Sequence, residues 1–301
     1  MTNATLTIGS IKLKATDGLI LLSLTVFILL GIVFEVDSWA VLTLKNVAVC
    51  IAYVAFIKFS ERARGKFLKF FLRVAAVTLT YAYMFGAVDK LQLIIHGHWL
   101  DNAVLAFERR VTGVQINIWI QQFISRPLTE WMMFSYVIYL PMYPVLCGII
   151  YFLRGELAME DYFFTLGLTN ILCDIGFILF PVASPMYWPA VKSQLTVPLD
   201  GWMWTYLGEL MRKYLHFAGG SIPSPHTAAA SVMWGMAYRY HRPSFWILTP
   251  VILSLFVSTF YGRYHYATDA VVGVAVAFLG FALAPKLMNV WEKAAVNKST
   301  T

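Results

Sequence analysis

Charged residues are scarce in this sequence. Asp, Glu, Lys and Arg together make up 13% of its 301 residues, about half their usual share in a soluble domain. Hydrophobic residues make up 59% and aromatic residues 16%, which excludes a disordered chain. A soluble fold of this length could not bury so much apolar surface, because the fraction that a domain buries is limited by its size. The composition therefore predicts a polytopic membrane protein.

Cysteine is scarce too. The chain has three cysteines, Cys50, Cys147 and Cys173, which lie far apart and inside apolar runs. They have neither the density of a disulfide scaffold nor the spacing of metal ligands. We therefore expect them to be small buried apolar residues.

Long apolar runs, by contrast, are abundant in the sequence. A membrane-spanning helix needs about 20 mostly apolar residues, and about eight segments of the chain come close to that. They cover residues 18–34, 40–57, 74–94, 130–153, 162–182, 226–240, 245–261 and 266–287. We therefore expect an all-α integral membrane protein with about eight transmembrane helices.

The net charge of +7 indicates orientation in the bilayer rather than binding to nucleic acid. Basic residues gather in short runs between apolar segments, as in residues 58–73, and such runs stay on the cytoplasmic side. This rule predicts that the N- and C-termini are cytoplasmic. It places the starts of the segments at residues 226 and 266 on the extracytoplasmic side, periplasmic or lumenal.

Two long connections fall on that same side. In residues 96–127 apolar and polar residues alternate as in an amphipathic helix that lies in the headgroup layer. Residues 183–225 are rich in Trp, Tyr, Pro and Gly, and so long a connection in a compact bundle is often functional. Tyr187 and its aromatic neighbours there predict either an aromatic belt or a lid over a site.

The first polar helix start is the segment Pro223-Ser224-Pro225-His226-Thr227. Ser224 is a plausible N-cap and Pro225 suits the first helical position. Free backbone N–H groups at such a start form an anion site. His226 lies in that first turn.

The second polar start contains Arg263, His265 and Asp269. His265 and Asp269 are four residues apart, so on a helix they would share a face. A carboxylate bonded to one imidazole nitrogen leaves the other nitrogen free as a nucleophile or base. Arg263 adds a permanent cation suited to phosphate.

Together these groups suggest phosphoryl transfer through a histidine. One imidazole attacks phosphorus, the other protonates the leaving oxygen, and the cation with the backbone donors binds the equatorial oxygens. Asn170 and Asp174, four apart in one apolar segment, either line the substrate cavity or pair with a polar neighbour.

The two motifs resemble those of the type-2 phosphatidic acid phosphatase superfamily of membrane lipid phosphatases and phosphotransferases. The family motif Pro-Ser-Gly-His is seen as Pro223-Ser224-Pro225-His226, and its His-x-x-x-Asp as His265 to Asp269. The resemblance covers about residues 74–287. It implies a six-helix catalytic domain over residues 74–301, preceded in residues 1–73 by a pair of transmembrane helices with a basic cytoplasmic loop.

The resemblance also implies residue roles. His265 becomes the phosphohistidine, Asp269 orients it, and His226 is the acid for the leaving group. Ser224, and with it Thr227 and Arg263, would bind the phosphate of the substrate. The family needs no metal and no other cofactor, so we expect none.

The chain departs from the family pattern in its first motif. Residues 180–187 lack the Lys and Arg of that motif, Pro225 replaces a Gly, and Arg263 lies closer to His265 than usual. These features are closer to the inositol phosphorylceramide synthase-like branch, which moves a phospho-headgroup between lipids. The resemblance thus favours a phosphotransferase with a membrane lipid donor and a lipid or headgroup acceptor.

Three other functions remain open. With water as acceptor, the protein would be a phosphatase of phosphatidate, prenyl diphosphate or a similar lipid. A lipid transporter or scramblase would use the bundle without chemistry. A metal-dependent hydrolase would use His226, His265 and Asp269 as ligands.

Overall fold

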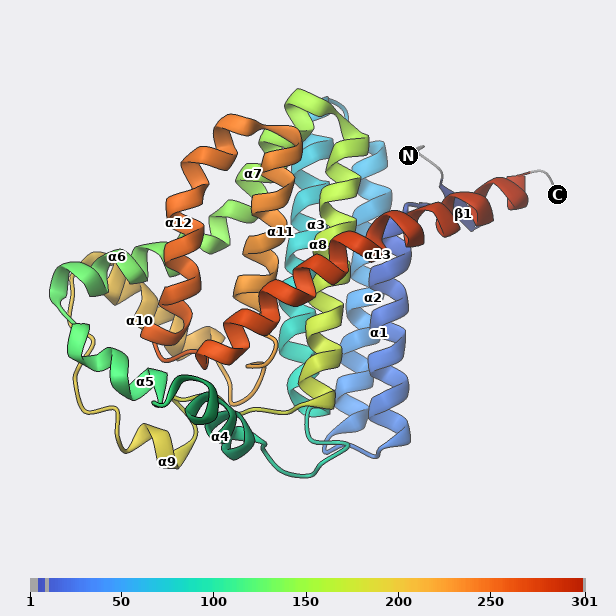
Figure 1. Cartoon of the computed structure of the whole chain (residues 1–301). Helices are drawn as coiled ribbons and strands as arrows, with labels where there is room; N and C mark the ends of the chain where they lie inside the picture. Colours follow the sequence, from blue (N-terminus) through green and yellow to red (C-terminus); the bar gives the residue numbers. More distant parts are fainter. Residues whose placement is uncertain (1–4, 9–10, 300–301) are drawn as a thin grey trace.

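The computed structural model describes residues 5–8 and 11–299, and this part of the chain is almost entirely helical (Figure 1). A short antiparallel hairpin, in which Leu6 pairs with Leu13, precedes the first helix. The elements in chain order are β1 (Leu6–Ile8), β2 (Ile11–Leu13), α1 (Ala15–Val33), α2 (Trp39–Arg62), α3 (Lys66–Ala87), η1 (Val88–Leu91), α4 (Asp101–Thr112), α5 (Ile116–Trp119), η2 (Ile120–Phe123), α6 (Arg126–Val137), α7 (Tyr139–Arg154), α8 (Glu156–Leu179), α9 (Pro189–Lys192), α10 (Met203–Leu215), α11 (Pro225–Tyr240), α12 (Arg242–Tyr261) and α13 (Ala267–Ser299).

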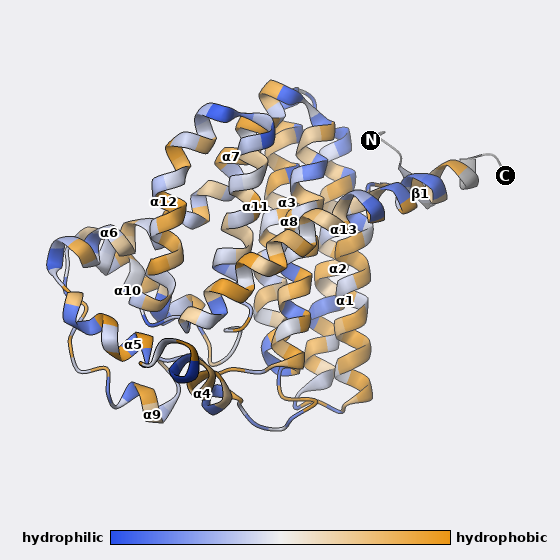
Figure 2. Cartoon of the chain, in the orientation of Figure 1, coloured by the Kyte–Doolittle hydropathy of each residue, from blue (hydrophilic) through white to orange (hydrophobic). Residues whose placement is uncertain are grey.

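Six helices in the described residues are long and apolar enough to cross a membrane: α1, α2, α3 with η1, α8, α12 and α13. The pair α6 and α7 adds a seventh span if it is counted as one, bent by 47°. The chain is thus an integral membrane protein. The eighth expected span is α11, which has only 16 residues, so the count of eight stays a prediction. Figure 2 shows the hydrophobic colouring along α1 and α2 that such spans require.

The bend between α6 and α7 follows from the sequence. Pro141 lies in the first turn of α7, where it lacks an N–H group and its ring clashes with the carbonyl four residues earlier. That carbonyl belongs to Val137, at which α6 ends. The proline therefore breaks what the apolar pattern predicts as one continuous span over residues 130–153.

Helix α11 lies at the centre of the bundle, against α8, α12 and α13. Ala228, Ala229 and Ala230 are fully buried, and small residues of this kind let helix backbones approach closely. At Gly273 of α13 an added Cβ would lie 2.2 Å from Thr227 Oγ1 and 2.4 Å from the Ser224 carbonyl. The close crossing of α11 and α13 brings their first turns together.

The N-terminal helices are joined to the rest of the bundle by a buried ion cluster, which consists of Asp17, Tyr53, Arg73 and Glu160. Arg73 donates to Asp17, and a second nitrogen lies 3.4 Å from Glu160. Tyr53 donates to Asp17 at 2.6 Å, and Glu160 accepts the backbone N–H of Thr16 at 2.9 Å. The cluster thus crosses the predicted domain boundary at residue 73. That boundary stays a prediction.

The segment predicted to be interfacial, residues 96–127, forms α4, α5 and η2. The buried side of α4 carries two carboxylates, those of Asp101 and Glu108. Glu108 accepts the backbone N–H of Thr268 at 2.9 Å, so α4 docks on the positive N-terminal end of α13. Phe107 and Val111 are exposed on the outer face of α4. Whether this face lies in the headgroup layer stays a prediction.

Candidate active site

Two helix starts, those of α11 and α13, form the site. The Ser224 N–H donates to the carbonyl of Asp269 at 2.9 Å, and the Thr227 hydroxyl donates to the carbonyl of Ala270 at 3.0 Å. Ser224 is the N-cap of α11. These bonds join the first turn of α11 to the first turn of α13, so the residues next to them are held side by side.

The joined turns bring the two predicted histidines into contact. His226 Nδ1 lies 3.2 Å from His265 Nε2, and the ring centroids are 5.4 Å apart with the planes at 61°. The side chain of His265 is buried. The two imidazoles therefore face each other across one small volume, which is the arrangement that the motif spacing predicts.

The environment of His265 fixes its tautomer. Nδ1 lies 3.0 Å from the carbonyl of Ser221, and a carbonyl can only accept, so Nδ1 carries the proton. Nε2 is then the nitrogen with the free lone pair, and it points toward His226. The unprotonated nitrogen of His265 is thus the one that faces the second histidine.

Asp269 does not bond directly to His265. Its Oδ2 lies 3.7 Å from His265 Nδ1, beyond a hydrogen bond, and instead accepts the Ser221 hydroxyl at 2.5 Å and the Tyr266 N–H at 2.9 Å. The expected pair four residues apart is thus present as a close charge contact without a hydrogen bond, because α13 begins only at Ala267 and His265 lies in the turn before the helix. The carboxylate therefore acts on the imidazole through space and through Ser221.

Two aromatic residues that the sequence did not single out extend the histidine pair. The Tyr136 hydroxyl lies 3.0 Å from His226 Nε2 and 2.7 Å from His216 Nε2. The ring of Tyr136 stacks on Tyr264 at 4.1 Å. We call His216, Tyr136, His226 and His265 the histidine cluster. No motif marked Tyr136, because it lies in an apolar segment, or His216, because it lies in a long loop.

His216 is neutral at neutral pH. It follows α10, whose N-terminal N–H groups bond to Glu130, and its Nδ1 lies 3.2 Å from the Met211 carbonyl. Burial lowers the pKa of His216 to about 4. With its single proton on Nδ1, Nε2 accepts a hydrogen bond from the Tyr136 hydroxyl, so the loop orients Tyr136 toward His226.

The three residues predicted to bind phosphate lie differently. The Arg263 guanidinium donates to the carbonyl of Val197, and within the described part of the chain it makes no hydrogen bond to His226 or His265. The hydroxyl of Ser224 accepts the Thr227 N–H at 3.5 Å, and that of Thr227 donates to backbone carbonyls. Both hydroxyls are fully buried and serve the junction of α11 and α13.

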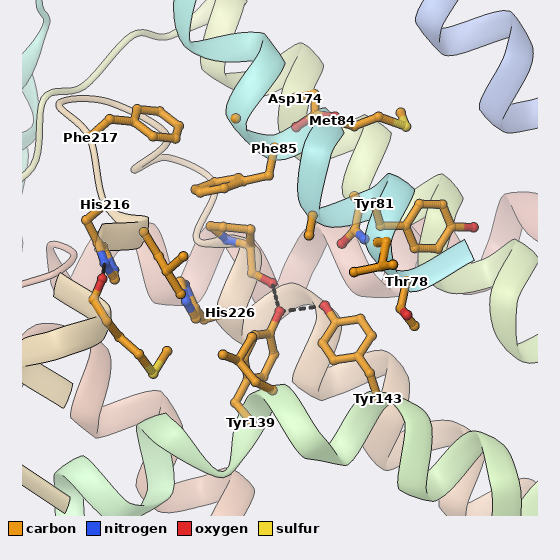
Figure 3. Close-up of a pocket in the computed structure, with 18 of the residues that line it drawn as sticks. Thr78, Tyr81, Met84, Phe85, Tyr139, Tyr143, Asp174, His216, Phe217 and His226 are labelled. Atoms are coloured by element: carbon orange, nitrogen blue, oxygen red, sulfur yellow. Dashed lines mark hydrogen bonds between the residues drawn. The ribbon is translucent and has the colours of Figure 1, made fainter. Parts of the chain in front are cut away.

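A cavity of about 660 Å³ leads to the site. Asn170 and Asp174 line it together with His216 and His226. Figure 3 shows the two histidines and Asp174 at different ends of this space, with Tyr139 and Tyr143 between α7 and the cavity. Tyr187 lines a smaller cavity beside it, together with His216, His226 and His265.

Metal ligation is a separate question. Within the residues that the structure describes, no group of three His, Cys, Asp or Glu side chains is arranged to hold a metal ion. Asp269 is turned toward Ser221 and the backbone of Tyr266 rather than toward the His226–His265 contact. The expectation that the protein needs no metal or other cofactor stays a prediction.

Comparison with known proteins identifies the family. No curated protein and no solved structure matches the chain significantly. A family model described as the PAP2 superfamily matches residues 102–283, which is more than half of the chain and includes both histidines and all residues of the cavities except those on α3. The chain therefore belongs to the type-2 phosphatidic acid phosphatase (PAP2) superfamily, whose members are generally phosphatases or phosphotransferases.

Proposed function

We propose that the protein is a membrane lipid phosphotransferase that moves a phosphoryl headgroup between lipids through a phosphohistidine, as in the inositol phosphorylceramide synthase-like branch. The observation that carries the proposal is the contact of 3.2 Å between His226 Nδ1 and His265 Nε2. A nucleophile and an acid that act on one phosphorus–oxygen bond must be neighbours in the site, and this contact makes the two imidazoles neighbours.

In the proposed first step, His265 Nε2 attacks phosphorus while the bond from phosphorus to the donor's oxygen breaks. His226, protonated on both nitrogens for this step, gives its Nδ1 proton to that leaving oxygen, so the donor departs as a neutral alcohol and His226 becomes neutral. In the second step His226 takes the proton of the acceptor hydroxyl, whose oxygen attacks phosphorus and releases His265. Since both nitrogens act on the same phosphoryl group, substrate binding must move them apart.

The surroundings of His265 support this role. The Ser221 carbonyl accepts the Nδ1 proton, which keeps Nε2 available before attack. Phosphorylated Nε2 leaves a positive charge on the ring, and the Asp269 carboxylate, 3.7 Å from Nδ1, stabilises that charge. Asp269 is buried, where such an interaction is stronger than in water.

The larger cavity supports a lipid acceptor over water. Its lining is mostly apolar and includes Leu79 of α3 and Leu140 of α7, which are 66% and 45% exposed on the surface of the bundle. A long-chain lipid fits such a space and opening. Its chain would exclude water from the phosphohistidine, and hydrolysis of the intermediate needs that water. With water as acceptor, the same residues would form a lipid phosphate phosphatase.

The proposal includes the orientation in the membrane. Helices α4 and α5 lie around the end of the bundle that holds the site, the C-terminal part of α13 projects sideways from the bundle beside α1, and the connection between α2 and α3 lies at the opposite end (Figure 1). The basic run between α2 and α3 supports a cytoplasmic position for the latter end. The site then lies on the extracytoplasmic side, with α4 as an interfacial helix and α11 as the eighth span. The termini are cytoplasmic in this orientation.

The test uses the purified full-length protein and a panel of phosphorus-labelled lipid donors, with and without lipid alcohols as acceptors. We expect label to move to an acceptor and to appear on His265 as an acid-labile adduct. His265→Ala removes both, whereas His98→Ala, which removes an exposed imidazole whose Nδ1 lies 2.7 Å from the His96 carbonyl, leaves both unchanged.

Other outcomes would contradict the proposal. Full turnover by His265→Ala excludes the phosphohistidine. Loss of activity with a chelator favours the metal-dependent hydrolase, and movement of unchanged lipid between leaflets that survives loss of His265 favours a transporter or scramblase. Release of inorganic phosphate regardless of acceptor identifies a phosphatase.

A further inference from the structure

Ser184 has a buried hydroxyl with nothing to bond to among the described residues. Its side chain is 3% exposed, and its Oγ has no hydrogen-bond partner. Ser184 lines the smaller cavity together with His226 and His265. This hydroxyl therefore shares the small space in front of the imidazole pair.

Neighbouring serines differ from Ser184 in this respect. Ser221 donates its hydroxyl to Asp269, Ser224 accepts a backbone N–H, and Ser135 donates to the carbonyl of Trp131 at 3.0 Å. Nearly all buried polar groups in proteins are hydrogen-bonded, and the exceptions call for an explanation. A cavity shared with two reactive imidazoles offers one, because a ligand there would accept the bond.

The backbone holds Ser184 in an unfavourable conformation. Its φ is +91°, a region that glycine adopts freely and other residues adopt at a cost. Asp101 accepts the N–H groups of Ala183 and Ser184 at 2.8 and 3.2 Å. The Ser184 carbonyl accepts the N–H of Trp188 at 2.9 Å. These hydrogen bonds thus hold a serine in a backbone conformation that glycine would adopt at a lower energetic cost.

The same carboxylate reaches the nucleophile's turn. Asp101 Oδ1 also accepts the hydroxyl of Tyr266 at 2.8 Å, and Tyr266 follows His265 directly. Asp101 is fully buried. The position of Ser184 relative to His265 is therefore set by one anchor that both segments share.

The structure assigns Ser184 as a phosphate-binding residue. Its hydroxyl donates a hydrogen bond to a non-bridging oxygen of the phosphoryl group that His265 attacks, and no covalent bond to Ser184 forms. Such oxygens are anionic and only accept, so a hydroxyl donor suits them. Residues 180–187 contain no Lys or Arg, so no cation of this segment competes for that oxygen. The assignment rests on the proposed function.

Two substitutions separate the hydroxyl from the backbone strain. Ser184→Ala removes the hydroxyl and keeps the strained conformation, whereas Ser184→Gly removes the hydroxyl and relieves the strain. Ser135→Ala is the matched control, since it removes a buried hydroxyl that already has a partner in its own helix. All are measured as the full-length protein in detergent, by steady-state phosphotransfer and by thermal unfolding.

We expect kcat/KM to fall about 10- to 100-fold in both Ser184 variants, the loss typical of a hydrogen bond to a charged group, and to stay within about twofold in the control. Thermal stability of Ser184→Ala stays near that of the wild type, because no internal bond is lost. Near wild-type kcat/KM in either Ser184 variant overturns the assignment, because both lack the hydroxyl.

A binding experiment distinguishes this failure from failure of the proposed function. Inorganic phosphate and a short-chain lipid phosphate in mixed micelles are each tested for raising the unfolding temperature of the wild type and of Ser184→Ala. Stabilisation that is weaker in the variant supports the assignment even if no donor turns over, and the probe that stabilises more identifies lipid or free phosphate as the source. Equal responses, or none, to both probes overturn it, whatever the outcome of the phosphotransfer assay.

Discussion

The molecule contains two buried polar groups of residues that differ in how their bonds are used. In the ion cluster, Asp17 and Glu160 flank Arg73, and Tyr53 adds a further hydrogen bond. These ion pairs and this hydrogen bond join helices α1, α2, α3 and α8 to each other. In the histidine cluster the same kind of burial leaves His265 Nε2 in contact with His226, and among the described residues the Ser184 hydroxyl nearby has no hydrogen-bond partner.

The difference indicates separate purposes. Buried charges are costly unless they compensate each other, so the ion cluster stabilises one arrangement of α1, α3 and α8. The histidine cluster borders two cavities and leaves hydrogen-bonding capacity turned toward them. Substitutions in the first are expected to change stability, and substitutions in the second to change activity.

The largest expected effect is on the ion cluster. Arg73→Met leaves Asp17 and Glu160 buried without their cation, and we expect a loss of about 3–5 kcal/mol in the free energy of unfolding. The triple variant with Asp17→Asn and Glu160→Gln should recover much of that loss, because no charge is then uncompensated. Denaturant unfolding in detergent measures both, and equal stability of wild type and Arg73→Met would contradict the comparison.

A pH effect of similar size is expected at His216. Its pKa is lowered by burial to about 4, below the ordinary 6.5, so the folded protein binds fewer protons than the unfolded chain between these values. The contribution of neutral His216 to stability is therefore fully present above about pH 6.5. The free energy of unfolding falls by up to about 3 kcal/mol as the pH drops to 4. His216→Gln should show a smaller slope in this window when unfolding is followed at each pH. An unchanged slope would mean that other groups cause it.

Tyr136→Phe is expected to lower kcat about 10- to 100-fold, because it removes the hydroxyl that contacts Nε2 of His226, the proposed acid. Stability should change by only about 1 kcal/mol. The pH profile of kcat serves as the critical readout. A purely structural role for Tyr136 would lower activity in proportion to the folded fraction and leave the profile unmoved.

The smallest expected effect is at Asp174. Asp174→Asn keeps the size of the side chain but replaces a carboxyl group in the cavity wall by an amide, and we expect the KM of a hydroxyl-bearing lipid acceptor to rise up to about tenfold. The donor's half-reaction, measured as label on His265, should be unaffected. Ser231→Ala, whose hydroxyl bonds within α11, is the control. An equal effect on both half-reactions would place Asp174 outside acceptor binding.

Much of the fold could be predicted because apolar runs of membrane length leave few alternatives to a helix. The short helix α11, Pro225–Tyr240, was predicted with nearly these bounds, as residues 226–240, whereas the break before Tyr139 was not predicted. A hydropathy profile carries no information on the backbone hydrogen bond that Pro141 removes. It also does not indicate that three consecutive alanines let a 16-residue helix pack at the centre of the bundle.

The candidate site, like the fold, could be predicted from the sequence only in part. Motif spacing led to His226 and His265, which the structure brings together. It did not give the relation of Asp269 to His265, because the rule of four residues holds only inside a helix and α13 begins at Ala267. The sequence did not predict that His216 and Ser184 belong to the site. Both lie in a long loop, whose conformation is set by contacts between residues far apart in sequence, such as those of Asp101 with Ser184 and Tyr266.

The bend between α6 and α7 has a consequence for how substrate would arrive. Tyr136 before the bend contacts His226, while Leu140 just after it lies on the outer surface beside the larger cavity. A long-chain substrate of the proposed enzyme would thus enter sideways from the leaflet without passing through water. The turnover rate would then follow the mole fraction of donor in the bilayer, and diluting the donor with inert lipid at constant total donor would slow the reaction.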